Sequence, residues 1–313
     1  MRKVGATLYK AIQKKFGFRE LLSFLSETKF TFVELYLPDE ELITSELNFN
    51  KEKLQDFNEI VACYDFGISV HGLYDNYNGI ISNLADLDDT LRKKAIQTTK
   101  KSIELCNLLN SQVLVIHPGT LFPYQKRKKS SSMNKLAAHP LDRPKGVKNI
   151  QNSIMNLLEH AEDFGVVLCL ENEVPRFETI PLCDNPFTLI QLCQALFEQF
   201  SDSFCGATLD LGHLALECTF YGFDLLQTVK AFQPYIKHIH FHDNLMIPCP
   251  LGGTKADKGY GDLHYPIGDG SIPYTGISPL LKNIKVDTVF NFEIFRIKKI
   301  DDFKPSKQFV DSV

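Results

Sequence analysis

Eight short β-rich runs alternate with longer segments of helical spacing, and no other feature constrains the fold of this chain as strongly. The predicted strands span residues 4–9, 31–37, 67–71, 112–117, 166–171, 204–209, 236–242 and 288–295. This alternation favours an α/β fold whose parallel sheet closes into a (β/α)8 TIM barrel. A doubly wound open sheet is the alternative, but it normally has about five to seven strands, and no G-x-G-x-x-G follows the first strand.

Helices are predicted between the strands, at residues 18–27, 51–63, 88–109, 148–163, 186–199, 223–232 and 279–284. Two long loops near 121–146 and 245–261 each follow a strand, which places both on the catalytic face of a barrel. The basic run 126–129 in the first loop is read either as a solvated surface or as a substrate contact. We find no repeat beyond the alternation and no low-complexity linker, so we expect residues 1–313 to form one domain.

The composition excludes several classes of protein. Lys and Arg number 34 against 38 Asp and Glu, so the net charge of −4 gives no global electrostatic argument for nucleic acid or membrane binding. No apolar run approaches the roughly 18 residues of a membrane span, and no cleavable leader is recognisable. The eight cysteines are scattered singly, without a C-x-x-C pair. They are predicted to be buried, reduced thiols of a cytoplasmic protein.

Six consecutive strands end in a residue that can bind a metal ion. These residues are His71, His117, Glu171, Asp210, His240 and Glu293. The carboxyl ends of barrel strands converge on one pocket. A single histidine there would be read as a hydrogen-bonded core residue, but buried charge on six strands is costly unless it is paired or metal-bound. Imidazole and carboxylate groups suit Zn²⁺, Mn²⁺, Mg²⁺ or Fe²⁺, so we expect one to three divalent ions.

Within this pattern, one ligand set takes a residue from each of four consecutive strands: Glu171, Asp210, His240 and Glu293. Period two along the seventh strand puts three histidines on one face, and they cannot all bind one ion. We expect His240 to be the ligand, with His238 one step deeper and His242 one step above. Asp262 and His264 point the same way on an extended segment, which suits a shared ion.

These phrases resemble the xylose isomerase-like TIM barrels, the superfamily of sugar phosphate isomerase/epimerase-like proteins and endonuclease IV. The resemblance runs from about residue 67 to 295, and Asn83-Leu84-Ala85, Val115-Ile116-His117-Pro118-Gly119 and Leu170-Glu171-Asn172 match both branches. Endonuclease IV uses nine ligands for three zinc ions, and all nine positions carry the right residue type here. The resemblance implies three groups: His71, His117 and Glu171; Glu171, Asp210, His240 and Glu293; His213, Asp262 and His264.

Several phrases are more similar to the sugar branch of the superfamily. Residues 210–213 read D-L-G-H, and residues 262–270 read D-L-H-Y-P-I-G-D-G, as in isomerase-like proteins. The first strand lacks the G-A-H-V-S opening of endonuclease IV. Against a typical ketose 3-epimerase, residues 245–247 read L-M-I and offer no counterpart to the Arg that these enzymes often place there.

Three functional hypotheses follow. The first is a metal-dependent sugar or sugar-phosphate isomerase or epimerase, in which a metal stabilises an enediolate, Glu171 and Glu293 exchange protons and His213 orients a hydroxyl. A dehydratase or lyase would share the first step. The second is an endonuclease IV-type phosphodiesterase acting on abasic DNA, with the basic run 126–129 against the backbone. The third is a non-catalytic barrel used as a binding module. The partner is a small carbohydrate, with nucleic acid only under the second hypothesis; no membrane partner is expected, and a homo-oligomer is expected by analogy alone.

Overall fold

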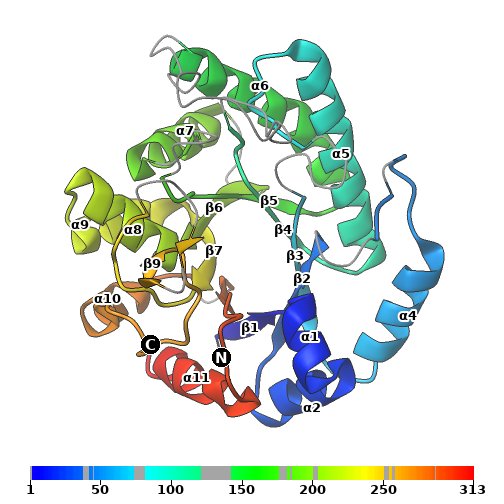
Figure 1. The fold of residues 1–313 in the computed structure, drawn as a ribbon. Helices are drawn as coiled ribbons and strands as arrows, with labels where there is room; N and C mark the ends of the chain where they lie inside the picture. The colour runs from blue at the N-terminus through cyan, green and yellow to red at the C-terminus, as the bar shows by residue number, and fades with distance from the viewer. Residues whose placement is uncertain are drawn as a thin grey trace, which may run out of the picture.

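Eight parallel strands form a closed barrel in the order β1-β10-β7-β6-β5-β4-β3-β2, as predicted (Figure 1). The strands are β1 (Lys3–Thr7), β2 (Phe32–Tyr36), β3 (Gly67–His71), β4 (Val113–Ile116), β5 (Val167–Glu171), β6 (Cys205–Asp210), β7 (Ile236–Phe241) and β10 (Val289–Phe292). This computed structural model describes residues 2–37, 42–44, 46–73, 82–120, 142–175, 182–183, 185–199, 204–249, 254–255, 258–285 and 287–313. All eight predicted strands are confirmed, with ends that differ by at most a few residues.

Helices surround the barrel on its outer side (Figure 1). They are α1 (Lys10–Phe16), α2 (Phe18–Glu27), α4 (Lys51–Val61), α5 (Asp89–Leu108), α6 (Asp142–Asp163), α7 (Pro186–Gln199), α8 (Leu211–Tyr221), α9 (Leu225–Phe232), α10 (Tyr274–Leu281) and α11 (Phe303–Asp311). Short 3-10 turns η3 (Gln233–Tyr235) and η5 (Ile300–Asp302) precede β7 and α11. The small strands β8 (Thr254–Lys255) and β9 (Tyr260–Gly261) pair antiparallel, apart from the barrel.

The helix predictions are less accurate than the strand predictions. Helix α6 begins at Asp142 rather than residue 148, and α10 spans Tyr274–Leu281 rather than 279–284, with Pro279 inside it. The sequence analysis did not predict α1, α8 or α11. Helix α8 was missed because its residues are buried on nearly all sides, so its sequence has no polar face to mark the period.

The strand β6 leads directly into α8 without a connecting loop. Asp210 ends the strand and is also the N-cap of the helix, where its side chain accepts a hydrogen bond from the His213 backbone N–H at 2.7 Å. The first turn of α8 therefore remains at the mouth of the barrel, and it holds His213 there.

The inside of the barrel carries a polar layer. In β2, the flanking Val33 and Leu35 pack in the apolar core, while Glu34 is fully buried against polar side chains of other strands. The fully buried Ser69, Thr208, His238 and Asn291 belong to the same polar set. Barrel interiors are usually filled by branched apolar side chains, so this layer requires a specific reason.

The two predicted long loops are only partly described. Residues 121–141, which include the basic run 126–129, lie outside the described residues, and residues 142–146 belong to α6. In the second loop, residues 250–253 and 256–257 are likewise outside them. All eight cysteines are free, and all except Cys63 are buried. No helix among the described residues is long and apolar enough to cross a membrane.

Candidate metal centre

All nine predicted ligands are described, and all lie at the carboxyl ends of the strands or in the segments that follow. His71, Glu171 and Asp210 are the last residues of β3, β5 and β6. His117 and Glu293 directly follow β4 and β10. Because the parallel strands of a closed barrel end at one face, these side chains meet at its mouth. The structure brings the nine residues together in three neighbouring groups.

The central group consists of Glu171, Asp210, His240 and Glu293, whose ligand atoms lie within 4.8 Å of one another. His240 Nδ1 is 2.7 Å from Glu171 Oε1 and 3.5 Å from Glu293 Oε2. Asp210 Oδ2 lies 3.7 Å from the same nitrogen. Three carboxylates and one imidazole form a mixed oxygen and nitrogen donor set that suits several divalent ions.

Glu171 belongs to a second group as well. Its Oε2 atom lies 3.3 Å from His71 Nε2 and 3.1 Å from His117 Nε2, while Oε1 faces His240. Oε2 is buried and has no hydrogen-bond partner in the described part of the chain. A carboxylate with one oxygen toward each of two ligand groups has the arrangement needed to bridge two ions.

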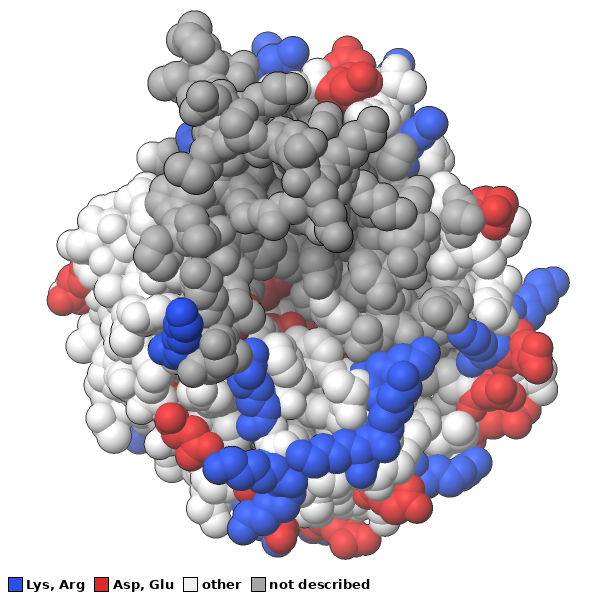
Figure 2. All heavy atoms as spheres, viewed as in Figure 1, with Lys and Arg blue, Asp and Glu red and all other residues white. Residues whose placement is uncertain are grey.

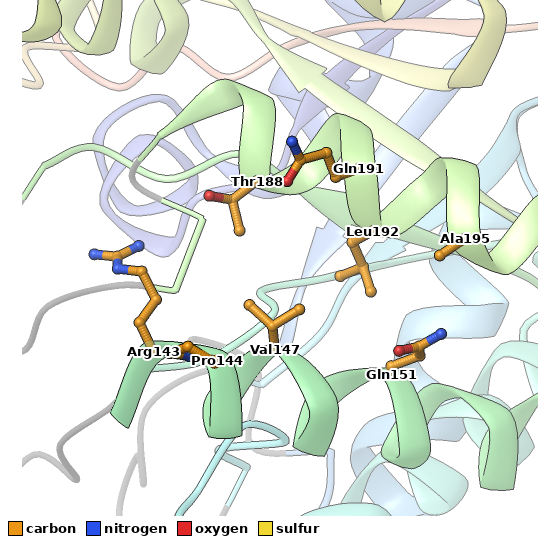
Figure 3. Close-up of a pocket in the computed structure, with 8 residues that line it drawn as sticks. All are labelled: Arg143, Pro144, Val147, Gln151, Thr188, Gln191, Leu192 and Ala195. Atoms are coloured by element: carbon orange, nitrogen blue, oxygen red, sulfur yellow. The ribbon is translucent and has the colours of Figure 1, made fainter. Parts of the chain in front are cut away.

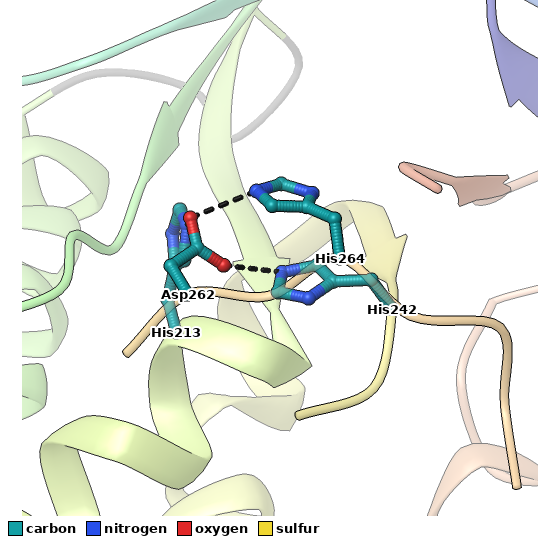
Figure 4. Close-up of side chains that lie close together, drawn as sticks. All are labelled: His213, His242, Asp262 and His264. Carbon is teal, nitrogen blue, oxygen red and sulfur yellow. Dashed lines mark hydrogen bonds and ion pairs between the residues drawn. The ribbon is translucent and has the colours of Figure 1, made fainter. Parts of the chain in front are cut away.

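The third group contains the predicted His213, Asp262 and His264, and also His242 (Figure 4). Asp262 Oδ2 lies 2.8 Å from His264 Nε2 and 3.3 Å from His213 Nε2. His242 Nε2 is 3.6 Å from Asp262 Oδ1 and 3.0 Å from Asp210 Oδ1. A Cβ atom at Gly212 would lie 1.9 Å from the His242 ring, so only glycine at this position leaves room for that side chain.

The histidines are oriented as metal-binding histidines usually are. A ligating imidazole normally donates its second ring N–H to a carbonyl or carboxylate, which fixes the tautomer and the ring direction. Five of the imidazoles have such a partner at 2.7–3.2 Å: His71, His213, His264, His117 and His240. The partners, in the same order, are the carbonyls of Gly72, Asn172 and Glu293 and the carboxylates of Glu173 and Glu34. The residues present therefore fit divalent ions.

The electrostatics of the cluster agree with this fit. Burial lowers the pKa of the His117 imidazole, but the adjacent Glu171 carboxylate outweighs burial and raises it to about 10. Burial raises the pKa of Asp210, but His213 and His242 outweigh it and lower that pKa to about 2. Glu171 and His117 thus hold each other in their charged forms at neutral pH, and so do Asp210 and His213. A divalent ion would replace the imidazole protons as the source of positive charge.

Sequence reasoning missed four residues at this site. The Tyr9 hydroxyl donates a hydrogen bond to Glu293, Glu34 contacts His240, and Glu173 Oε1 lies 3.0 Å from His117 Nδ1. The fourth is His242, which was left as a neighbour of the ligand. The available sequence signal for Glu34 was a lone carboxylate inside an apolar strand. The signal for Glu173 was the alternation of side chains along Glu171-Asn172-Glu173, which puts both glutamates on one face.

Figure 2 looks onto this face of the molecule. Acidic atoms lie at the base of the central hollow, and Lys and Arg side chains gather on the rim over α1 and α11. Lys14 and Lys15 of α1 are exposed, as are Lys298 and Lys299 just before η5. Lys15 Nζ donates to the Ile297 carbonyl at 2.6 Å, which joins the two segments. The mouth therefore combines an acidic floor with a basic edge.

A separate groove lies between α6 and α7 (Figure 3). Its lining residues are Arg143, Pro144, Val147, Gln151, Thr188, Gln191, Leu192 and Ala195. They include no imidazole, thiol or carboxylate, and the Arg143 guanidinium donates to the Leu182 carbonyl at 2.8 Å. This groove lacks the imidazole and carboxylate side chains found at the barrel mouth.

Comparison with curated proteins finds distant relatives. An uncharacterised protein of Methanocaldococcus jannaschii is 26% identical over 245 residues, which cover 78% of this chain and 69% of that protein. The apurinic-apyrimidinic endonuclease 1 of Plasmodium berghei is 24% identical over 272 residues, 80% of this chain but 47% of the relative. The chain thus spans about half of the endonuclease that it matches.

Solved structures share the fold over almost the whole chain. A D-tagatose 3-epimerase-like protein superposes with a TM-score of 0.71 at 22% identity, covering 99% of this chain and 97% of the other. A D-psicose 3-epimerase from Clostridium cellulolyticum H10, solved with D-tagatose, has a TM-score of 0.63 at 13% identity and covers 99% and 97%. The sequence profile described as xylose isomerase-like TIM barrel matches residues 22–313. With its closed barrel and nearly complete match to this profile, the chain belongs to the xylose isomerase-like TIM barrel family.

Proposed function

We propose that this protein is a divalent-metal-dependent isomerase or epimerase of a sugar or sugar phosphate. The observation that carries the proposal is the pairing of two buried carboxylates around one imidazole: Glu171 and Glu293 lie 2.7 and 3.5 Å from His240 Nδ1. They come from β5 and the end of β10, three strands apart around the barrel. Two such groups can remove a proton from one face of a carbon next to a carbonyl and return one to the opposite face, as an epimerisation requires.

Each residue has a defined part in this proposal. A bound divalent ion would act as a Lewis acid and stabilise the negative charge of an enediolate. Glu171 accepts the substrate proton and Glu293 donates one, while the Tyr9 hydroxyl holds Glu293 through its hydrogen bond. His213 orients a substrate hydroxyl from the first turn of α8. The enzymes among the structural neighbours include epimerases of ketoses, which supports a carbohydrate as the substrate.

The basic rim favours an anionic substrate within this class. Lys and Arg side chains over α1 and α11 border part of an acidic mouth that would itself repel anions. Positive charge at the edge of a cleft raises the local concentration of anions and their rate of association. A sugar phosphate, whose phosphate would meet the rim while its carbonyl reaches the central group, fits this distribution better than a neutral ketose.

A phosphodiesterase is the second candidate, and the two-sided Glu171 carboxylate favours it. Multi-ion sites suit phosphoryl chemistry because separate ions can stabilise the attacking and leaving oxygens. The similarity to an apurinic-apyrimidinic endonuclease, at 24% identity, supports the same class, with abasic DNA as the substrate. In this candidate all three ligand groups would hold an ion at once.

Solvent exchange tests the first proposal without knowledge of the product. The metal-loaded protein is incubated in D2O with panels of ketoses, aldoses and their phosphates, and deuterium at carbon is detected by NMR. Exchange into one substrate is expected, and Glu293→Gln is expected to reduce it by about 10²–10⁴-fold. Absence of exchange throughout the panel, or full turnover by Glu293→Gln, would contradict the proposal. Elemental analysis and native mass spectrometry then count the ions, and three ions with cleavage of an abasic duplex would establish the second candidate instead.

A further inference from the structure

We propose that Glu34, deep inside the barrel, is a positioning residue that fixes the ring of His240 with Nδ1 facing the central group. The inference rests on the proposed metal-dependent function, but it concerns how the chain builds the site. Glu34 is in β2, on the opposite side of His240 from Glu171, and it is fully buried. Neither the ligand pattern nor the proposed reaction assigns a role to it.

The two ring nitrogens of His240 have separate carboxylate partners. Nδ1 faces Glu171 Oε1 at 2.7 Å, while Nε2 lies 3.1 Å from Glu34 Oε1 and 3.2 Å from Oε2. A neutral imidazole that binds an ion through Nδ1 carries its hydrogen on Nε2. Glu34 is placed to accept that hydrogen, and the carboxylate, imidazole and ion then form the triad that commonly orients metal-binding histidines.

Glu34 is itself held in place by hydrogen bonds. Thr7 Oγ1 donates to Oε1 at 2.9 Å, Asn291 Nδ2 donates to the same oxygen at 2.9 Å, and Ser69 Oγ donates to Oε2 at 3.3 Å. These donors come from β1, β10 and β3, so the carboxylate is fixed from three strands. A Cβ at Gly5 would lie 2.8 Å from Asn291 Oδ1, so this glycine leaves room for the amide. A buried charge with this many dedicated partners indicates a role that an apolar side chain could not fill.

His240 differs in this respect from three of the other predicted imidazole ligands. His71, His213 and His264 present Nε2 to their groups while a backbone carbonyl holds Nδ1. His240 presents Nδ1, and within the described part of the chain its Nε2 atom faces Glu34 and no backbone carbonyl. The side chain of Glu34 takes the place of that carbonyl. It is therefore a partner that substitution can remove, whereas a backbone carbonyl is not.

An additional ion between Glu34, His238 and His240 is the competing explanation, because the ligand atoms of these three residues lie within 4.8 Å of one another. Among the described residues, neither buried ring nitrogen of His238 has a hydrogen-bond partner, although Nε2 lies 3.3 Å from Glu34 Oε2. An ion at this place would have to displace the hydrogen from His240 Nε2 and compete with three donors for Glu34. We therefore favour the positioning role and use the ion count to separate the two.

The test measures metal affinity rather than turnover. Zn²⁺ and Co²⁺ affinities of the full chain are determined by chelator competition for the parent, Glu34→Gln and Glu34→Ala, with circular dichroism as the check on folding. Glu34→Gln is expected to weaken the tightest-bound ion by about 10–100-fold and to change the visible spectrum of bound Co²⁺. Ser153→Ala, which removes a buried hydrogen bond to the Leu84 carbonyl, is the control for a general loss of packing. Glu173→Gln is the matched variant, and it is expected to weaken the group that contains His117 instead.

A second measurement needs no Glu34 variant. In ¹⁵N-labelled, Zn²⁺-loaded parent protein, long-range NMR spectra report the tautomer of each histidine, and His240→Asn assigns the signal. Hydrogen on Nε2 of His240 with metal on Nδ1 is expected. Three outcomes would overturn the inference. One is metal bound to Nε2 of His240, and another is unchanged metal affinity in a folded Glu34→Gln variant. The third is a Glu34→Gln variant that loses one additional ion but keeps the central ion. A parent protein that binds no ion would overturn the proposed function as well. Ion binding by the parent protein therefore separates failure of this inference from failure of the proposed function.

Discussion

At the scale of single residues, Glu171 is the side chain on which the site depends most. Its two oxygens face two ligand groups, at 2.7 Å from His240 and 3.1 Å from His117. Burial raises the pKa of this carboxyl, but His240 and His117 outweigh burial and hold it well below the usual value. Glu171 therefore stays ionised at neutral pH.

Substitution of Glu171 is expected to affect more of the centre than substitution of Asp262, which belongs to one group only. Glu171→Gln removes the charge from two groups, so ion content should fall in both of them. Asp262→Asn should leave the central ion in place. Elemental analysis of the two variants after equal dialysis measures the difference. Equal ion loss in the two variants would show that Glu171 does not link the groups.

The metal-free protein is expected to lose stability as pH rises. Folding raises the pKa of His117 to about 10 and that of His264 to about 9 from the ordinary 6.5, because carboxylates outweigh burial at both rings. The protonated rings therefore contribute stability fully below pH 6.5, and that contribution disappears as pH rises through 9 to 10. Urea unfolding of chelator-treated protein at pH 6.5 and 9.5 measures the fall. Bound Zn²⁺ should abolish most of this fall in stability between the two pH values, because metal-bound imidazoles are neutral at either pH.

At the scale of elements, the strands could be predicted from the sequence and several of the helices could not. Each strand is a short apolar run next to a polar turn, and each predicted strand is present. Helix α8 follows β6 without a turn and is apolar on nearly all sides. Its sequence therefore has neither turn residues in front of it nor a helical alternation of polar and apolar residues. Six of the nine candidate ligands could be listed because they stand at strand ends, and His213, Asp262 and His264 completed the set through the family resemblance. Glu34 could not, because its role depends on the register that places it beside Thr7 and Ser69 in neighbouring strands.

Asp210 links element structure and site chemistry, and two substitutions separate its roles. As N-cap of α8 it accepts from the His213 N–H at 2.7 Å, and as a member of the central group it faces His240. Asparagine caps helices as well as aspartate does, whereas alanine does not. In the presence of a chelator, the free energy of unfolding of Asp210→Ala is expected to be about 0.5–2 kcal/mol lower than that of Asp210→Asn. Both variants should bind the central ion more weakly than the parent, and equal stability of the two would contradict the capping role.

At the scale of the whole molecule, the ligand groups tie together strands from the two halves of the barrel. The central group alone joins β5, β6, β7 and the end of β10, and Glu171 extends the cluster to β3 and the end of β4. An ion that binds the folded barrel and not the unfolded chain stabilises the entire domain by mass action.

Removal of metal is therefore expected to lower the melting temperature of the whole barrel in one transition. With free ion at 100 times its dissociation constant, the stabilisation is about 2.7 kcal/mol. For a chain of 313 residues that corresponds to a shift of roughly 4 °C. Calorimetry of chelator-treated and Zn²⁺-reconstituted protein measures it. Identical melting temperatures, with ion binding verified in the same samples, would show that the ions contribute nothing to the barrel.

The spread of the ligands along the chain also sets an order of events during synthesis. Glu171 and Asp210 leave the ribosome well before Glu293, which completes the central group. Roughly 80 residues separate Asp210 from Glu293, so the ribosome needs about 4–16 s to supply the last ligand. Until then the earlier carboxylates and imidazoles form an incomplete donor set in a barrel that has not closed. If the central group holds an ion, its acquisition would be tied to closure of the barrel by β10, and a chain released before that strand would be open and would lack Glu293.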